Sequence, residues 1–459
     1  MTQNASQKTF RVVTGKSCST PLVRRQFLRR MGHDVLVGAT GLAGLASLSN
    51  LATLARQGKT AREFGRAAFE LSTVTAQDAV PSLTDQSPQI VPRPPWELLE
   101  RDTARHGAVF ALDRKYCMVV AGTPEQMGAA HGRLLRWFVH RLVERVVYGL
   151  NAAEAVSRGS WLLDTLAEVE RRTLPYIPER FIAECDAMSQ ASGIATRDGR
   201  YANFFPERFH CSGFAVRGRA SQGGRILHAR VLDYMRDIAL QRYAAVQIFI
   251  PDGYLPWMSL GYGGFIGTVT AMNSAGVAVG EMGGRGEGAW NGVPMSLLLR
   301  DVMERAHTTD EAFEILRSTP RTCEYYYVIS DCHGAICGVK ATPERIERLE
   351  PGVQHAELPT VPPDTVLMSA GNRAKELSRR LHERYGKIDV PAMIEMMRRP
   401  VAMESNLHNA VFAPQSQEMW FANAGRTTPA CDESYCHCCL PEMLNLYRRV
   451  MNAPIATPQ

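Results

Sequence analysis

A change of pattern at residue 211 limits the folds that this chain can adopt. Before residue 211, long stretches carry apolar residues at helical spacing. From residue 211 onward, short apolar runs alternate with turn signals, and Ser221-Gln222-Gly223-Gly224 joins the first two runs as a hairpin. Helical patterns return between the later strands. This order predicts an α+β fold in which helices pack outside two antiparallel sheets, giving four layers in the order αββα.

Periodicity and capping signals set the boundaries of the expected elements. Thr123 and Pro124 open a long helix, as its cap and its first-turn residue. The expected strands are 107–121, 211–217, 225–234, 244–250, 257–262, 265–272, 277–282, 325–330 and 335–340, and further helices are expected at 160–173, 179–192, 294–306 and 310–318.

Length and composition favour one compact unit behind an N-terminal extension. The 459 residues are 45% hydrophobic and 21% charged, which is ordinary for a globular protein with a sizeable core. The net charge is +6, and much of the excess of Lys and Arg lies before residue 70. The positive charge therefore belongs to the N-terminal extension, and no nucleic-acid-binding face is predicted. The Gly-rich stretch 261–267 does not join a strand to a phosphate-binding helix, which argues against a nucleotide site.

The first 55 residues resemble a twin-arginine export signal. Arg24 and Arg25 precede Gln-Phe-Leu and further positive charge, and a weakly apolar run follows from Val35 to Ala55. The alternative is a basic amphipathic surface helix. The export interpretation predicts a folded protein carried by the twin-arginine translocon to the periplasm or cell envelope, with cleavage after Ala55.

Cys211 heads a strand, and Arg230 and Asp233 lie near the end of the next one. A two-stranded hairpin would bring the open ends of both strands together, so the three side chains are candidates for one site. A free cysteine titrates near ~8.5, and a neighbouring Arg lowers that pKa, while a carboxylate can orient an amine. The plain alternative is a buried core cysteine beside a surface ion pair.

Cys211-Ser-Gly-Phe-Ala-Val, followed by Arg230-Val-Leu-Asp233, resembles the start of the mature chain in N-terminal-nucleophile (Ntn) hydrolases. The resemblance is to the isopenicillin-N acyltransferase-like (acyl-coenzyme A:6-aminopenicillanate acyltransferase) family, and more distantly to the conjugated bile-salt hydrolases. It covers about residues 107–450. Further motifs follow in the family's order: Gly122-Thr-Pro-Glu-Gln-Met-Gly, Pro175-Tyr-Ile-Pro-Glu, Met272-Asn273-Ser-Ala-Gly and a late helix bearing Arg373.

The resemblance implies an Ntn-type αββα sandwich and self-cleavage between His210 and Cys211. The freed α-amine of Cys211 would act as the base for its own thiol, and an acyl thioester would form on that sulfur. Asp233 would orient the amine, while Arg230 and Arg373 would hold the thiolate or a substrate carboxylate. No cofactor and no metal is expected.

This sequence departs from the family at two positions. His210 stands where many members have Gly before the nucleophile. The Asn that completes the oxyanion hole in bile-salt hydrolases is replaced by Gly283, so backbone N–H groups, Asn273 or Asn372 are the candidate donors. We favour a hairpin-turn role for Asn273. Glu281 is either a substrate contact or a turn residue.

Four cysteines near the C-terminus, Cys431, Cys436, Cys438 and Cys439, surround His437 but lack zinc-finger spacing. A disulfide or buried free thiols are expected there in place of a metal. The predicted divisions are 1–55 (export signal), 56–105 (irregular arm), 106–210 (mostly helical segment), 211–450 (catalytic segment) and 451–459 (tail).

The sequence predicts an autoproteolytic cysteine amidohydrolase or acyltransferase that acts on linear amide bonds of an N-acylated small molecule or peptide. Two alternatives stay open. One is a papain-like cysteine protease with His210 or His228 as the partner of Cys211. The other is an inactive envelope binding protein with the same fold.

Overall fold

The computed structural model describes residue 90 and residues 95–112, 114–149, 162–204, 210–234, 236–284 and 288–453. The chain divides into two units, Met1–Leu83 and Thr84–Gln459, and every described residue belongs to the second. The predicted export signal, with Arg24 and Arg25, and most of the predicted arm therefore lie outside the described residues.

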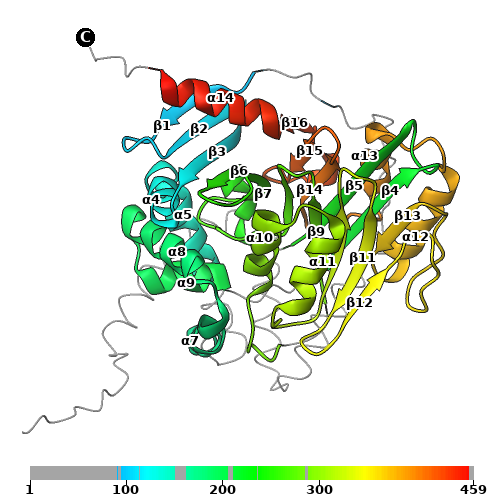
Figure 1. Ribbon diagram of the computed structural model, residues 1–459, viewed down its shortest axis with the longest axis horizontal. Coiled ribbons are helices and arrows are strands. Elements are labelled where there is room, and N and C mark those ends of the chain that lie inside the picture. The colour runs from blue at the N-terminus through cyan, green and yellow to red at the C-terminus, as the bar shows by residue number, and fades with distance from the viewer. Residues whose placement is uncertain are drawn as a thin grey trace, which may run out of the picture. The chain divides into compact units, whose positions relative to one another are not determined.

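Ten strands form the larger sheet, in the order β1-β2-β3-β6-β7-β8-β9-β10-β11-β12 (Figure 1). All neighbouring strands are antiparallel except β3 and β6, which run parallel. The strands are β1 (Glu97–Arg101), β2 (Gly107–Leu112), β3 (Lys115–Gly122), β6 (Ala244–Pro251), β7 (Trp257–Tyr262), β8 (Thr270–Asn273), β9 (Ala278–Gly283), β10 (Tyr325–Ser330), β11 (Ile336–Ala341) and β12 (Ile346–Leu349).

Six antiparallel strands form the smaller sheet, in the order β13-β4-β5-β14-β15-β16. They are β13 (Thr365–Met368), β4 (His210–Gly218), β5 (Gly224–Asp233), β14 (Asn406–Ala413), β15 (Glu418–Asn423) and β16 (Cys436–Cys439).

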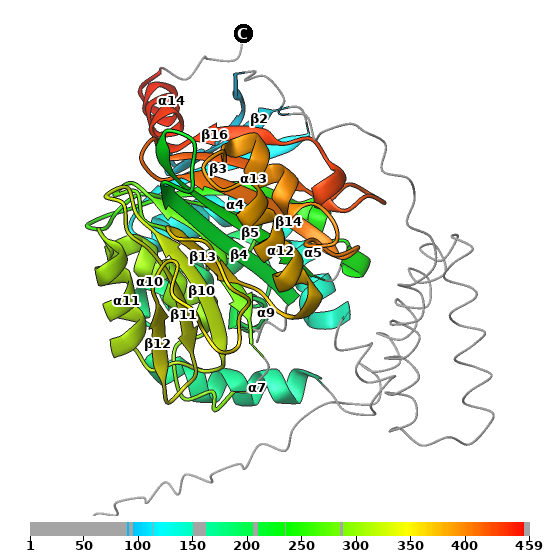
Figure 2. The same ribbon diagram turned by 90° about the vertical axis from the view of Figure 1, so that its right-hand side faces the viewer.

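Helices cover the outer faces of both sheets, which pack against each other (Figure 2). On the ten-stranded side lie α4 (Pro124–Leu134), α5 (Arg136–Val143), α7 (Leu162–Thr173), α8 (Glu179–Ser192), α9 (Thr196–Phe204), α10 (Met295–Arg305) and α11 (Thr309–Ser318). On the six-stranded side lie α12 (Gly371–Glu383) and α13 (Val390–Met397). The last helix, α14 (Leu440–Asn452), closes one end of the core between the sheets (Figure 1).

The predicted α+β fold with four αββα layers is confirmed. Thr123 caps α4 as expected, because its Oγ1 accepts a hydrogen bond from the backbone N–H of Gln126 at 3.3 Å. The Gln126 side chain accepts in return from the N–H of Thr123 at 2.9 Å, which completes a capping box. No helix among the described residues is long and apolar enough to cross a membrane.

Several predicted boundaries are wrong in detail. Residues 107–121 form two antiparallel strands, β2 and β3, in place of one, and Leu112 pairs with Lys115 at the end of the hairpin. Part of the supposedly irregular arm is the strand β1, whose mostly exposed residues show no alternation. The strand expected from residue 265 begins only at Thr270, after a loop in which Gly264 adopts a positive φ of 97°. Helix α14 continues past residue 450 to Asn452.

Candidate active site around Cys211

The β4–β5 hairpin aligns the predicted residues in register. His210 pairs with Asp233, Cys211 with Leu232, and Gly213 with Arg230. Side chains alternate between the two faces of a strand, so Cys211 and Arg230 share the inner face, toward the larger sheet. Asp233 shares the outer face, toward α12 and α13. The hairpin thus brings the three residues together but divides them between two faces of one sheet.

On the inner face, the Cys211 thiol lies beside two fully buried charged groups. Nη2 of Arg230 is 3.4 Å from Oε2 of Glu281, and neither side chain has any exposed surface. The Arg230 guanidinium is also close enough to the thiol to lower its pKa by charge attraction. Burial raises the pKa of Cys211 to about 11, and the Arg230 cation offsets only part of that rise. The thiol is therefore protonated at neutral pH in this single, uncut chain.

Glu281, on β9, was expected to be a substrate contact or a turn residue, and it is instead the buried partner of Arg230. Burial raises its pKa to about 7, against the opposing effect of Arg230. Its second oxygen, Oε1, is buried without a hydrogen-bond partner among the described residues. The carboxyl group is therefore poised between its neutral and charged forms near physiological pH.

On the outer face, Asp233 is held by two partners. Its Oδ1 accepts a hydrogen bond from the Met403 N–H at 2.9 Å, and its Oδ2 forms an ion pair with Arg373 of α12. Burial raises the pKa of Asp233, while Arg373 and the Met403 N–H oppose that rise. Arg373 was expected at the thiolate or at a substrate carboxylate, but the structure places its guanidinium on Asp233.

Asn273 has the turn role that we favoured. Its Nδ2 donates to the carbonyl oxygens of Met303 at 3.0 Å and Ala306 at 2.7 Å. Its Oδ1 accepts from the N–H groups of Ala275 and Val277. The buried amide is therefore occupied by backbone groups and is not available to an oxyanion.

The other predicted donors lie at the ends of elements. Gly283 is the last residue of β9 and pairs with Tyr325 of β10. Asn372 is exposed at the second position of α12. His210 begins β4, and its backbone pairs with Asp233.

Two further side chains near Asp233 were not among the residues predicted from the sequence. Asn406 of β14 pairs with Asp233 in register, and its Nδ2 donates to the Leu232 carbonyl at 3.0 Å. Ser212 lies between Arg373 and Ser369 on the outer face. Ser212 directly follows Cys211 in the chain, which is the one signal that the sequence carries for it. Nothing in the spacing connects Asn406 with Cys211.

A cysteine–histidine dyad with His228 does not form. His228 pairs with Ala215, four residues along β4 from Cys211, which corresponds to roughly 13 Å at ~3.3 Å per residue. Its Nδ1 bonds to Ser330 Oγ at 2.9 Å, and burial, together with Arg230, lowers its pKa to about 3. Cys211 is also the second residue of a strand, whereas a papain-like nucleophile begins a helix. The structure therefore disfavours His228 as the base.

The remaining candidates lie away from this site. Cys431, Cys438 and Cys439 carry free thiols. Within the described ranges, no group of three or more His, Cys, Asp or Glu is placed to hold a metal ion.

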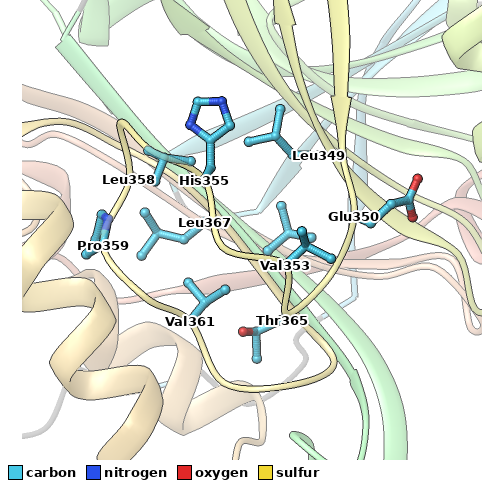
Figure 3. Close-up of a pocket in the computed structure, with 10 residues that line it drawn as sticks. Leu349, Glu350, Val353, His355, Leu358, Pro359, Val361, Thr365 and Leu367 are labelled. Atoms are coloured by element: carbon cyan, nitrogen blue, oxygen red, sulfur yellow. The ribbon is translucent and has the colours of Figure 1, made fainter.

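A small hollow near the β12–β13 connection lies toward the other end of β4 from Cys211 (Figure 3). It is lined mainly by apolar side chains, among them Leu349, Val353, Leu358, Val361 and Leu367.

The family model for acyl-coenzyme A:6-aminopenicillanic acid acyl-transferase matches residues 221–357. The predicted resemblance to this family is thereby confirmed.

Curated relatives match part of the chain. Protein dcd1B of Dictyostelium discoideum is 27% identical over 234 residues, which are 45% of this chain and 46% of that protein. N-acylethanolamine-hydrolyzing acid amidase of Rattus norvegicus is 23% identical over 182 residues, 37% of this chain and 49% of that protein. The chain spans about half the length of the curated relatives it matches.

Among solved structures, the Caenorhabditis elegans ortholog of N-acylethanolamine-hydrolyzing acid amidase is similar over 45% of this chain and 93% of that chain. The TM-score is 0.37 and the sequence identity is 18%.

Proposed function

We propose, from the match to the acyl-coenzyme A:6-aminopenicillanic acid acyl-transferase family, that this protein is a self-cleaving cysteine amidohydrolase or acyltransferase. Its substrate would be the linear amide bond of an N-acylated small molecule or peptide. One observation carries the proposal: Cys211 lies at the start of β4, with Arg230 beside its thiol and Asp233 paired with the residue that precedes it. That arrangement serves a nucleophile whose own amine becomes its base.

Self-cleavage would begin with attack of the Cys211 sulfur on the carbonyl carbon of His210. The C–N bond to Cys211 breaks, the acyl group moves to sulfur, and the nitrogen takes up a proton. Water then hydrolyses the thioester. This leaves a carboxylate at His210 and both a thiol and a free α-amine at Cys211.

Turnover would use the new amine. A thiol whose pKa is about 11 is a poor nucleophile at neutral pH and needs a base. The α-amine, with an ordinary pKa near ~8, would take the thiol proton and later pass it to the leaving amine. Asp233 would orient the α-amine, and Arg230 would stabilise the thiolate. Water or an acceptor amine would release the acyl group from sulfur.

The oxyanion would be stabilised by donors other than Asn273, since that amide is engaged by backbone groups. Of the predicted donors, the Gly283 N–H and the Asn372 amide remain. Gly283 ends β9 and is partly exposed, and Asn372 is exposed near the start of α12.

The test compares wild type with Cys211→Ala and Cys211→Ser by intact mass and N-terminal sequencing. Wild type should yield a fragment that begins Cys-Ser-Gly-Phe. Cys211→Ala should stay a single chain, because it has no attacking atom, and Cys211→Ser should process slowly. Cys337→Ala is the matched control, since Cys337 is another buried strand cysteine and lies outside the site.

Hydrolysis should then be screened on a panel of N-acyl amino acids, with an N-acylethanolamine included because one relative is named for hydrolysing that class. Activity that persists in Cys211→Ala would contradict the catalytic role. A wild type that stays uncut and inactive would favour a binding protein with this fold.

A further inference from the structure

We propose that Ser212, the residue after the nucleophile, is a positioning residue that holds Arg373 against Asp233. The inference rests on the proposed function, in which Asp233 orients the α-amine of Cys211. It adds a role for a side chain that points away from the thiol and has no contact with the reacting sulfur.

The hydrogen bonds around Ser212 define that role. A single nitrogen of Arg373, Nη2, donates to Ser212 Oγ at 2.9 Å and also forms the ion pair with Asp233 Oδ2. A guanidinium can only donate, so Ser212 must accept. The hydroxyl of Ser212 is in turn 2.7 Å from the hydroxyl of Ser369, which follows β13. Ser212 therefore fixes the nitrogen on which Asp233 depends.

The burial of Asp233 and Arg373 makes each of their hydrogen bonds important. The Asp233 side chain has no exposed surface, and Arg373 is only 17% exposed, so water offers little replacement for a lost partner. The opposite end of the guanidinium is fixed as well, because Nε donates to the Val401 carbonyl at 2.7 Å. Its third nitrogen, Nη1, lies 3.6 Å from Met403 Sδ. Nη2 has two acceptors, Asp233 and Ser212, so loss of the Ser212 hydroxyl leaves Asp233 as its one remaining acceptor among the described residues and weakens the orientation of the guanidinium.

Ser212 would influence Cys211 through Asp233 and the backbone nitrogen of Cys211. Ser212 and Asp233 share the outer face, whereas the thiol and Arg230 lie on the inner face. The backbone nitrogen of Cys211 lies in the strand between these two groups. A change at Ser212 should therefore act on the α-amine and leave the surroundings of the thiol intact.

The experiment measures alkylation of Cys211 by iodoacetamide in the mature, cleaved protein, followed by mass spectrometry of the N-terminal peptide across pH. This probe reports how readily the thiol is deprotonated and needs no knowledge of the substrate. Ser212→Ala should slow alkylation at neutral pH about ten-fold, the size of one hydrogen bond to a charged group. Its pH midpoint should move upward, because a misoriented amine accepts the thiol proton less well.

Ser378→Ala is the matched control. Ser378 lies on the same helix as Arg373, but among the described residues its hydroxyl bonds to the Thr360 carbonyl alone, at 2.6 Å. This variant should match wild type in both rate and pH midpoint. A double-mutant cycle with Arg373→Ala adds a second test, since Ser212→Ala should have almost no further effect in that background.

An unchanged rate and pH midpoint in Ser212→Ala would overturn the inference, and so would effects of Ser212→Ala and Arg373→Ala that simply multiply. Failure of the proposed function looks different. In that case wild type itself yields no chain that begins at Cys211, and no mature protein exists to alkylate.

Discussion

At Cys211, the alternation of a β-strand divides the chemistry between two environments. The thiol meets Arg230 and Glu281 in the dry space between the sheets. Asp233 meets Arg373 on the helical side. The backbone nitrogen of Cys211 lies in the strand between them, which explains why an α-amine at this position could connect the two groups.

The buried carboxyl group of Glu281 should make the free energy of unfolding depend on pH. Burial raises its pKa from 4.5 to about 7, so the folded state binds this proton more tightly than the unfolded state does. The resulting contribution to stability is complete below pH 4.5 and is lost as the pH rises through about 7. Glu281→Gln should not lose stability in this way between pH 5 and pH 8, whereas the parent should lose on the order of a few kcal/mol in its free energy of unfolding.

The measurement is the urea midpoint at pH 5 and at pH 8, in the uncut Cys211→Ala background so that cleavage does not intervene. Glu314→Gln is the control, because Glu314 is exposed and Arg317 lowers its pKa. If Glu281→Gln and its parent lose the same amount of stability between pH 5 and pH 8, Glu281 is not the origin of the pH dependence.

At the scale of elements, a largely buried network of ion pairs connects α8 with α10. The Arg300 guanidinium donates to both oxygens of Glu184, at 2.9 and 2.6 Å, and to Glu304 at 2.8 Å. Its face packs on the Phe181 ring, with a separation of 4.7 Å from the ring centroid. Arg180 of α8 adds ion pairs to Glu304 and Asp301. Arg300, Glu184 and Glu304 are at most 1% exposed, so water cannot replace a lost partner in this central part of the network.

Removing one partner from this network should be costly. Glu184→Gln leaves the buried Arg300 charge without its bidentate partner, and we expect a loss of about 3 kcal/mol or more in the free energy of unfolding. Glu168→Gln is the control, since it breaks an exposed pair with Arg171 and should barely change the stability. Denaturant unfolding of both variants measures the difference, and equal effects would show that the network does not hold the helices.

At the scale of the whole molecule, a cut before Cys211 would divide the larger sheet between two fragments. Strands β1 to β3 come from one fragment, and the remaining seven strands from the other. The parallel pairing of β3 with β6 runs from Cys117↔Val246 to Gly122↔Pro251 and crosses between them. The α8–α10 network crosses as well. Neither fragment could complete its core alone.

We therefore expect the two fragments to stay together after cleavage. Cleaved wild type should elute from a sizing column at the same volume as uncut Cys211→Ala, and should separate into two species only in denaturant. Fragments that part in native buffer would show that the shared sheet does not hold them.

The export prediction also belongs to the whole molecule. Replacing Arg24 and Arg25 with Lys keeps the charge but removes the guanidinium pair, so the precursor should remain in the cytoplasm. Cell fractionation measures this. The matched control replaces Arg29 and Arg30, a second Arg pair in the same leader, and should not block export. Normal export of the first variant would remove the twin-arginine assignment.

Local pattern was enough to predict much of the fold. Period-2 alternation and turn residues predicted the β4–β5 hairpin, and the hairpin alone implied that Cys211, Arg230 and Asp233 approach one another. Capping signals likewise placed the start of α4 at Thr123. These features depend on neighbours a few residues apart, so the sequence determines them directly.

Tertiary structure decided what lies around that hairpin. Glu281 reaches Arg230 from the facing sheet, and Arg373 reaches Asp233 from a helix 140 residues later. Ser212 and Asn406 gain their partners in the same way. No periodicity encodes such contacts, because they depend on how the layers pack. The hairpin that carries Cys211 was therefore predictable from sequence, whereas the side chains that surround Cys211 depend on the packing of the sandwich.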